Sequence, residues 1–225
     1  MDRRRRQGAF TTVEMMVVIA VLAVLIVAAV PVLTDFSSNQ RARTAARSLG
    51  DAFMVARSEA IRTGNQFVVF FGPPGSQDPA GTDIVDSAGT PVPLLILDDG
   101  APSAANCRID GGEDIRTVRP VADVSWGVTH ATAQAPLDFG SGTYTSGWSF
   151  RDPSNNAVNW VMFGPDGIPV TFDATGGDCG DVGRQGSGGA GLYVTNGKRD
   201  YAVVLSPLGG VRLHTWNQGA GSWTN

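Results

Sequence analysis

The feature that most constrains this 225-residue chain is an unbroken apolar run over residues 15–33, close to the N-terminus. A helix rises about 1.5 Å per residue, so about 20 apolar residues match the roughly 30 Å hydrocarbon core of a bilayer. Four arginines, Arg3 to Arg6, precede the run, and no comparable basic segment follows it. Because basic residues stay on the cytoplasmic side, we expect a membrane helix over residues 10–33 with the following chain outside the cytoplasm.

Two details distinguish this segment from an ordinary secretory signal. The small residues Gly8 and Ala9 lie before the apolar run, whereas a secretory signal has its cleavage site after that region. Glu14 lies just inside the run, where a carboxylate is costly and usually has a partner. A cut before Phe10 would create an amine that neutralises Glu14 of the same or a neighbouring subunit. The alternative is that Glu14 reaches back to the membrane interface.

The positions of Phe10, Glu14 and Pro31 together resemble the class III signal of type IV pilins and type II secretion pseudopilins. In that family an inner-membrane prepilin peptidase cuts before the aromatic residue and methylates the new amine. The resemblance therefore implies a cleaved basic leader over residues 1–9 and an N-methylated Phe10. The family favours glycine before the aromatic residue, whereas this chain has Ala9 there and Gly8 one residue earlier. We favour the cut after Ala9, and a cut after Gly8 is the alternative.

Beyond Pro31 the helical pattern continues as an amphipathic segment. Apolar residues recur at steps of three and four, which predicts one buried helix face: Ala42, Ala45, Ala46, Leu49, Phe53, Ala56 and Ala60. Arginines fall mostly off this face, and Gly64 suits a helix C-cap. We expect one helix up to Thr63, with a transmembrane half over residues 10–33 and an amphipathic half over 34–64. Pro31 is expected to kink it where membrane meets water.

After Gly64 the pattern changes to short strands, predicted over residues 66–71, 94–97, 124–128, 158–163, 168–172, 192–195, 201–206 and 211–216. Turn residues at 164–167 and 196–198 predict two hairpins, and those at 207–210 lead into the last strand. The loops 72–93 and 176–191 are expected on the surface, and we find no internal repeat. The predicted fold is α+β and type IV pilin-like, with the long helix packed on an antiparallel β-sheet domain over residues 65–225.

Three later segments narrow the resemblance. Residues 56–64, 163–167 and 201–209 look like the most recognisable parts of the GspH/FimT group. These proteins are minor pseudopilins of type II secretion and minor pilins of type IV pili. The resemblance implies a single-pass inner-membrane protein with a periplasmic domain, incorporated into a pseudopilus that exports folded proteins. The alternative is a type IV minor pilin that primes assembly or takes up DNA. The implied partners are other pilin or pseudopilin subunits, the prepilin peptidase, the inner-membrane assembly platform and membrane lipid.

Charge and cysteine content limit the remaining options. The chain has a net charge of −4 and its leader +3, so the mature chain would have −4 − 3 = −7, which disfavours general nucleic-acid binding. Cys107 and Cys179 would lie in an oxidising compartment, where one disulfide is the simplest interpretation, although sequence cannot prove the pairing. Arg212 is a weak nucleic-acid candidate, because it matches only the second arginine of a pattern linked to DNA uptake in FimT-like pilins.

No catalytic constellation is found, so we expect no enzyme activity, no cofactor and no metal. His130 and His214 are the only histidines and stand far apart. Trp216 and Trp223 could stack on bases, but packing is the favoured interpretation. Several loop carboxylates lack the spacing of a known calcium loop, so solvated acids are favoured over calcium binding: Asp98, Asp99, Asp110, Glu113, Asp114, Asp173, Asp178 and Asp181.

Overall fold

The computed structural model describes residues 11–119 and 121–225, without the side chains of residues 27–32. The chain divides into two compact units, Met1–Ser38 and Asn39–Asn225. The predicted leader and Phe10 lie outside the described residues. The first unit contains the N-terminal part of helix α1. The second contains the rest of α1 and every strand.

Helix α1 extends over Thr12–Thr63. It ends at Gly64, whose N–H donates to the Ala60 carbonyl at 3.0 Å and whose φ is +75°. Glycine adopts this left-handed conformation without steric cost, which confirms Gly64 as the residue that closes the helix. The helical backbone continues through Pro31. The side chain of Pro31 lies outside the described ones, and the kink stays a prediction.

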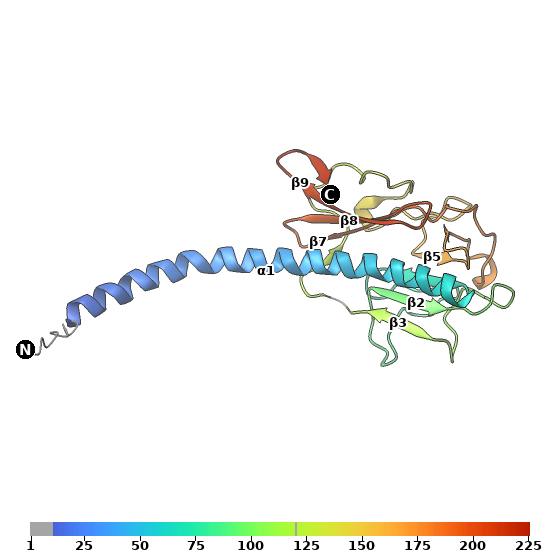
Figure 1. Ribbon diagram of the computed structural model, residues 1–225, viewed down its shortest axis with the longest axis horizontal. Helices are drawn as coiled ribbons and strands as arrows, with labels where there is room; N and C mark the ends of the chain where they lie inside the picture. The colour runs from blue at the N-terminus through green and yellow to red at the C-terminus, as the bar shows by residue number, and fades with distance from the viewer. Residues whose placement is uncertain (1–10, 120) are drawn as a thin grey trace, which may run out of the picture. The chain divides into compact units, whose positions relative to one another are not determined.

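The strands of the second unit form two antiparallel sheets, a division that the sequence analysis did not specify (Figure 1). The first sheet has the order β3 (Ile115–Val118), β2 (Leu94–Asp98), β1 (Phe67–Phe71), β5 (Trp160–Phe163) and β6 (Pro169–Val170). The second has the order β10 (Ser222–Thr224), β9 (Val211–Asn217), β8 (Asp200–Leu205), β7 (Gly191–Thr195) and β4 (Ser125–Trp126). Two short 3-10 helices are η1 (Tyr144–Ser146) and η2 (Thr175–Gly177). The α+β class and the pilin-like arrangement of helix and antiparallel strands are confirmed.

The C-terminal half of α1 lies between the two sheets (Figure 1). All seven apolar residues predicted for its buried face are buried, which confirms that prediction. The Phe53 ring lies 6.4 Å from Phe71 and 6.5 Å from Phe163, both in the first sheet. On the other side, a Cβ at Gly50 would lie 3.1 Å from a methyl carbon of Val211 in the second sheet. Small residues therefore let the helix approach both sheets.

Arg57 ties the helix to one turn from each sheet. Its Nε donates to the Gly167 carbonyl at 3.0 Å, in the hairpin between β5 and β6. Its Nη1 donates to the Gly209 carbonyl at 3.1 Å, in the turn between β8 and β9. The hairpins predicted at residues 164–167 and 196–198 are confirmed, because β5 pairs with β6 and β7 pairs with β8 in antiparallel register. The turn at 207–210, which was predicted to lead into the last strand, joins the antiparallel strands β8 and β9.

The loop over residues 72–93 corrects two expectations. It is not purely a surface loop, because Ile84 and Val92 are buried in the core. It also contains a short repeat that we missed, Asp-x-Ala-Gly-Thr at residues 78–82 and again at 86–90. In each copy the aspartate Oδ1 accepts backbone N–H groups from the residues two and four positions later, at 2.7–2.9 Å. Two successive aspartate-capped turns thus give this loop its shape.

The glycine-rich loop over residues 176–191 also contributes to the interior. Ala190 is buried, and Gly188 and Gly189 lie so close to Pro169 and Pro207 that a Cβ on either glycine would come within 2.9 Å. These glycines therefore allow close packing between loop and turn. The expectation that this loop lies wholly on the surface was wrong.

The second sheet has a further small core on the face away from α1. Tyr193, Ala202 and Val204 are buried there with Ala135 of the segment before η1. The buried carboxylate of Asp200 holds this segment by accepting the backbone N–H groups of residues 129–131 at 2.7–2.9 Å. One aspartate therefore closes a covering segment over the outer face of the sheet.

Replacing Arg57 tests its role as a tie between helix and turns. Arg57→Met keeps side-chain length but removes both donors, so two part-buried carbonyls lose their partners. We expect the free energy of unfolding to fall by about 1–3 kcal/mol. Chemical denaturation of the detergent-solubilised chain, followed by tryptophan fluorescence, measures this. Arg47→Met, at an exposed position of the same helix, is the matched control. Equal loss in both variants would contradict the role.

Candidate functional site

The first candidate site is the N-terminal end of α1. Thr11 precedes the helix, and its Oγ1 accepts the backbone N–H of Glu14 at 3.2 Å. Glu14 lies in the first helical turn, where the helix dipole favours a negative charge. Threonine followed three residues later by glutamate is a capping-box pattern. Glu14 therefore has a local role besides the predicted pairing with an amine at Phe10, which lies outside the described residues.

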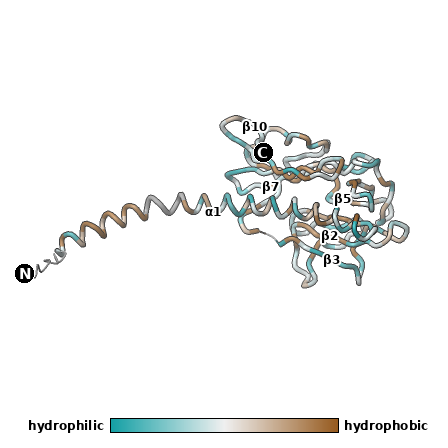
Figure 2. Tube along the Cα trace, viewed as in Figure 1, coloured by the Kyte–Doolittle hydropathy of each residue, from teal (hydrophilic) through white to brown (hydrophobic). Residues whose placement is uncertain are grey.

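The helix beyond this cap has a strongly apolar surface (Figure 2). Large apolar side chains between residues 13 and 26 are exposed, from 45% for Val18 to 70% for Val24. They occur all around the helix, unlike the single buried face at residues 42–60. Apolar surface of this extent in contact with water is unfavourable, at about 25 cal/mol per Å². It therefore marks a surface for lipid or another chain.

The membrane prediction extends beyond what the structure describes. Within the described part of the chain, no helix is long and apolar enough to cross a bilayer. The predicted span over residues 10–33 includes Phe10 and the side chains of residues 27–32, which are not described. The span and its orientation stay predictions.

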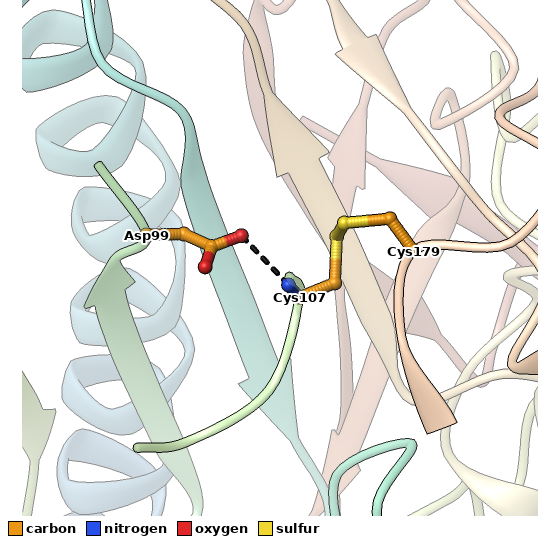
Figure 3. A group of neighbouring side chains, drawn as sticks. All are labelled: Asp99, Cys107 and Cys179. Atoms are coloured by element: carbon orange, nitrogen blue, oxygen red, sulfur yellow. Dashed lines mark hydrogen bonds between the residues drawn. A yellow bond between two sulfur atoms is a disulfide. The ribbon is translucent and has the colours of Figure 1, made fainter. Parts of the chain in front are cut away.

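The second candidate is the group formed by Asp99, Cys107 and Cys179 (Figure 3). Cys107 and Cys179 form a disulfide, with their Cα atoms 5.0 Å apart. Metal binding by cysteine requires a thiolate, which these bridged sulfurs cannot provide. The Asp99 carboxylate accepts the backbone N–H groups of Asn106 at 3.1 Å and Cys107 at 2.8 Å. Burial raises the pKa of Asp99. The group therefore anchors the segment around residues 106–107 rather than forming a metal centre.

The residues considered for nucleic acids and catalysis do not form one site among the described residues. Arg212 is exposed on β9. Trp216 is buried, and its ring centroid lies 5.3 Å from that of Trp223. Trp223 Nε1 donates to the Ala133 carbonyl at 2.7 Å, so both indoles pack within the domain. His130 lies 3.1 Å from the Gly197 carbonyl through Nε2.

His214 is buried on β9, and neither ring nitrogen has a hydrogen-bond partner among the described residues. Burial, with a smaller effect from the charge of Arg212, lowers the pKa of His214. A neutral buried imidazole with no acid or nucleophile bonded to it does not make a catalytic centre.

The family profile of the prokaryotic N-terminal methylation motif matches residues 4–30. This chain carries the pilin-type methylation signal. The motif indicates a membrane-anchored, type IV pilin-like protein that a prepilin peptidase processes and that assembles with other pilin-like subunits. A comparison with curated proteins and one with solved structures each found no match.

The cap at Thr11 is the site feature that sequence reasoning missed. Its signal was present, because threonine at 11 and glutamate at 14 directly precede the apolar run. The role of Asp99 had no such signal. Its carboxylate meets residues seven and eight positions later, through a loop whose path the local sequence does not determine.

The pKa of His214 predicts a pH dependence of stability. The ordinary histidine pKa is 6.5, and the folded-state pKa is lower. As pH falls below about 6.5, the unfolded chain binds a proton that the folded chain does not, so folding stability decreases. We expect His214→Leu to remove this contribution between pH 7 and 5, and Arg212→Gln to weaken it.

The measurement is the difference in unfolding free energy between wild type and variant at each pH, by chemical denaturation. Taking this difference cancels the contribution to the unfolding free energy of carboxylates that titrate in the same pH range. A difference that does not change with pH would contradict the assignment.

Proposed function

We propose that this chain is a minor pseudopilin of a type II secretion system, with a structural role in the export of folded proteins across the outer membrane. The observation that carries the proposal is the methylation motif at residues 4–30, directly joined to an apolar helix with exposed side chains on all sides. Such a helix fits first in a bilayer and then in a bundle of like helices. The narrower placement in the GspH/FimT group rests on the resemblance of residues 56–64, 163–167 and 201–209, and the alternative within that group is a minor pilin of a type IV pilus.

The proposed mechanism is assembly rather than catalysis. A cut before Phe10 would create an amine one helical turn from Glu14. In a fibre, this amine would neutralise Glu14 of a neighbouring subunit, because an unpaired carboxylate among packed apolar helices is costly. Pro31 would locally loosen the helix between its membrane and domain halves. The folded domain, tied to the helix by Arg57, would then move with its anchor as one subunit.

Processing is the first test. We expect the protein isolated from membranes to begin at Phe10 and to carry one additional methyl group when the prepilin peptidase is present. Intact mass and N-terminal sequencing check this, with a peptidase-deficient strain as control. A chain that begins at Met1 in both strains would contradict the proposed function. A start at Ala9 would place the cut after Gly8 instead.

Substitution of Glu14 is the second test, because capping the helix and neutralising an amine require different properties of its side chain. Glu14→Gln keeps a side chain that suits the capping box but removes the charge needed to neutralise an amine. If pairing between subunits dominates, we expect at least a tenfold loss of incorporation into fibres with normal membrane insertion. Crosslinking to a major subunit, followed by immunoblotting, measures incorporation.

Thr11→Ala is the matched variant, since it removes the cap and keeps the charge. We expect it to retain most of the incorporation. The reverse pattern, with Glu14→Gln normal and Thr11→Ala defective, would assign Glu14 to capping alone.

Deleting the gene distinguishes the two systems. Loss of enzyme secretion supports type II secretion, and loss of surface pili with normal secretion supports the type IV minor pilin.

A further inference from the structure

The turn between β7 and β8 lies beside the first residue of the second unit. Asn196 Nδ2 donates to Asn39 Oδ1 at 2.9 Å, and the Tyr201 hydroxyl donates to the Asn39 carbonyl at 3.3 Å. The turn residues 196–199 therefore share one end of this unit with the start of its helical segment. This is the end at which the chain continues into the apolar unit.

Basic side chains gather at this end. Arg41 and Arg43 are exposed on the helix, and Lys198 and Arg199 are exposed on the turn. Arg43 and Arg199 both act electrostatically on the Tyr201 hydroxyl, which donates to the Asn39 carbonyl, so both lie at this end of the unit. The turn also borders a polar hollow of about 370 Å³, lined by Lys198, Arg199, Thr215, Trp216, Asn217, Gln218, Gly219 and Thr224. We call Arg41, Arg43, Lys198 and Arg199 the basic end.

The acids near the basic end are already engaged or buried. Asp123 pairs with Arg41 at 2.9 Å. Asp200 is buried and accepts three backbone N–H groups. Among the described residues, neither Arg43 nor Arg199 forms a salt bridge with a carboxylate. Arg43 and Arg199 therefore keep positive charge available for an external anion.

The opposite end of the same unit is acidic. Asn65, just after the helix, donates to Asp98 at 2.9 Å. Burial raises the pKa values of Asp99 and Glu113, with smaller contributions from the charges of Asp98 and Asp110. Hydrogen bonds from Asn106 to Asp99 and Asp110, and from the Asp110 N–H to Glu113, hold these carboxylates at the same end. The unit is thus basic where the apolar segment is attached and acidic at the far end of its helix, although the whole chain is acidic.

Chain length keeps the basic end close to the anchor whichever way the two units sit. Five residues lie between Leu33, the last of the apolar run, and Asn39, which makes six residue steps. Fully extended, these six steps reach at most about 20 Å. A bilayer surface that holds the apolar run would therefore be within reach of Arg43 and Arg199.

We propose that the basic end docks on anionic phospholipid headgroups of the membrane that holds the anchor, before the subunit enters a fibre. This inference rests on the membrane anchoring in the proposed function. Each arginine near an anionic surface favours the docked state by about fivefold, so Arg43 and Arg199 together contribute about 25-fold. Docking would hold the acidic end away from the bilayer and leave one face of the domain presented to the assembly machinery.

The test uses the full chain in vesicles and a fluorescent label near the basic end. Ser222 is exposed on β10, and both native cysteines are in the disulfide, so Ser222→Cys accepts a donor dye selectively. The protein is added to preformed vesicles of phosphatidylcholine, with or without 30% phosphatidylglycerol, that carry an acceptor dye on their headgroups. Energy transfer then reports how close the basic end lies to the surface, and flotation reports whether the chain is anchored.

We expect more energy transfer with phosphatidylglycerol than without it, and loss of the difference at 0.5 M salt. Arg43→Gln combined with Arg199→Gln should reduce the docked-to-undocked ratio about 25-fold, with flotation unchanged. Arg184→Gln, at an exposed site on another loop, is the control for a lost positive charge and should match wild type.

Three results would overturn the proposal in different ways. Normal flotation with equal energy transfer in both lipids would reject docking and leave anchoring intact. Failure to float in either lipid would reject docking together with membrane anchoring. A double variant that loses affinity for a DNA duplex but keeps its lipid-dependent energy transfer would assign the basic end to nucleic acid, and would also reject docking.

Discussion

The burial of one face of α1 between two sheets is the contact on which the second unit depends. The stripe is mostly alanine, so the helix axis can come close to the strands on both sides, and the Phe53 ring packs on Phe71 of β1 and Phe163 of β5. Gly50 makes the same approach possible toward β9. The helix is therefore the shared core element of the domain, and Arg57 secures its far end to both sheets.

Two successive segments of helix α1 differ in how their apolar side chains are covered. Over residues 42–60 one face, mostly alanine with Leu49 and Phe53, is buried, whereas over residues 13–26 large apolar side chains are exposed. A soluble protein would bury the second set, because exposed apolar surface of this size favours association. The methylation motif covers this exposed part. The motif and the exposed apolar surface thus both indicate that lipid or other helices surround the N-terminal segment.

Much of the fold could be predicted because its signals are local. The buried helix face follows from a period of three to four residues, and the hairpins follow from glycine and proline at defined turn positions. Strand β3 was missed because its four residues include the exposed Arg116 and Thr117, which hide the apolar pattern. The division into two sheets has no local signal. It depends on pairings such as β1 with β5, whose strands lie about 90 residues apart in sequence. At the candidate site, Glu14 was identified from its charge alone, while its cap was visible in the sequence and was overlooked.

The bond between Arg57 and Gly209 joins residues 152 positions apart. Strands β8 and β9 are the last long strands of the chain, so the helix gains its second sheet only when nearly the whole polypeptide has emerged. Contacts of such long range slow folding, and an incomplete chain exposes its apolar surfaces in the meantime. Helix α1, which is synthesised early, is therefore fully covered only after strands β8 and β9 have been synthesised. Folding of this chain would be limited by completion of the C-terminal strands, and a chain truncated before β8 would leave its helix without the central strands of the second sheet.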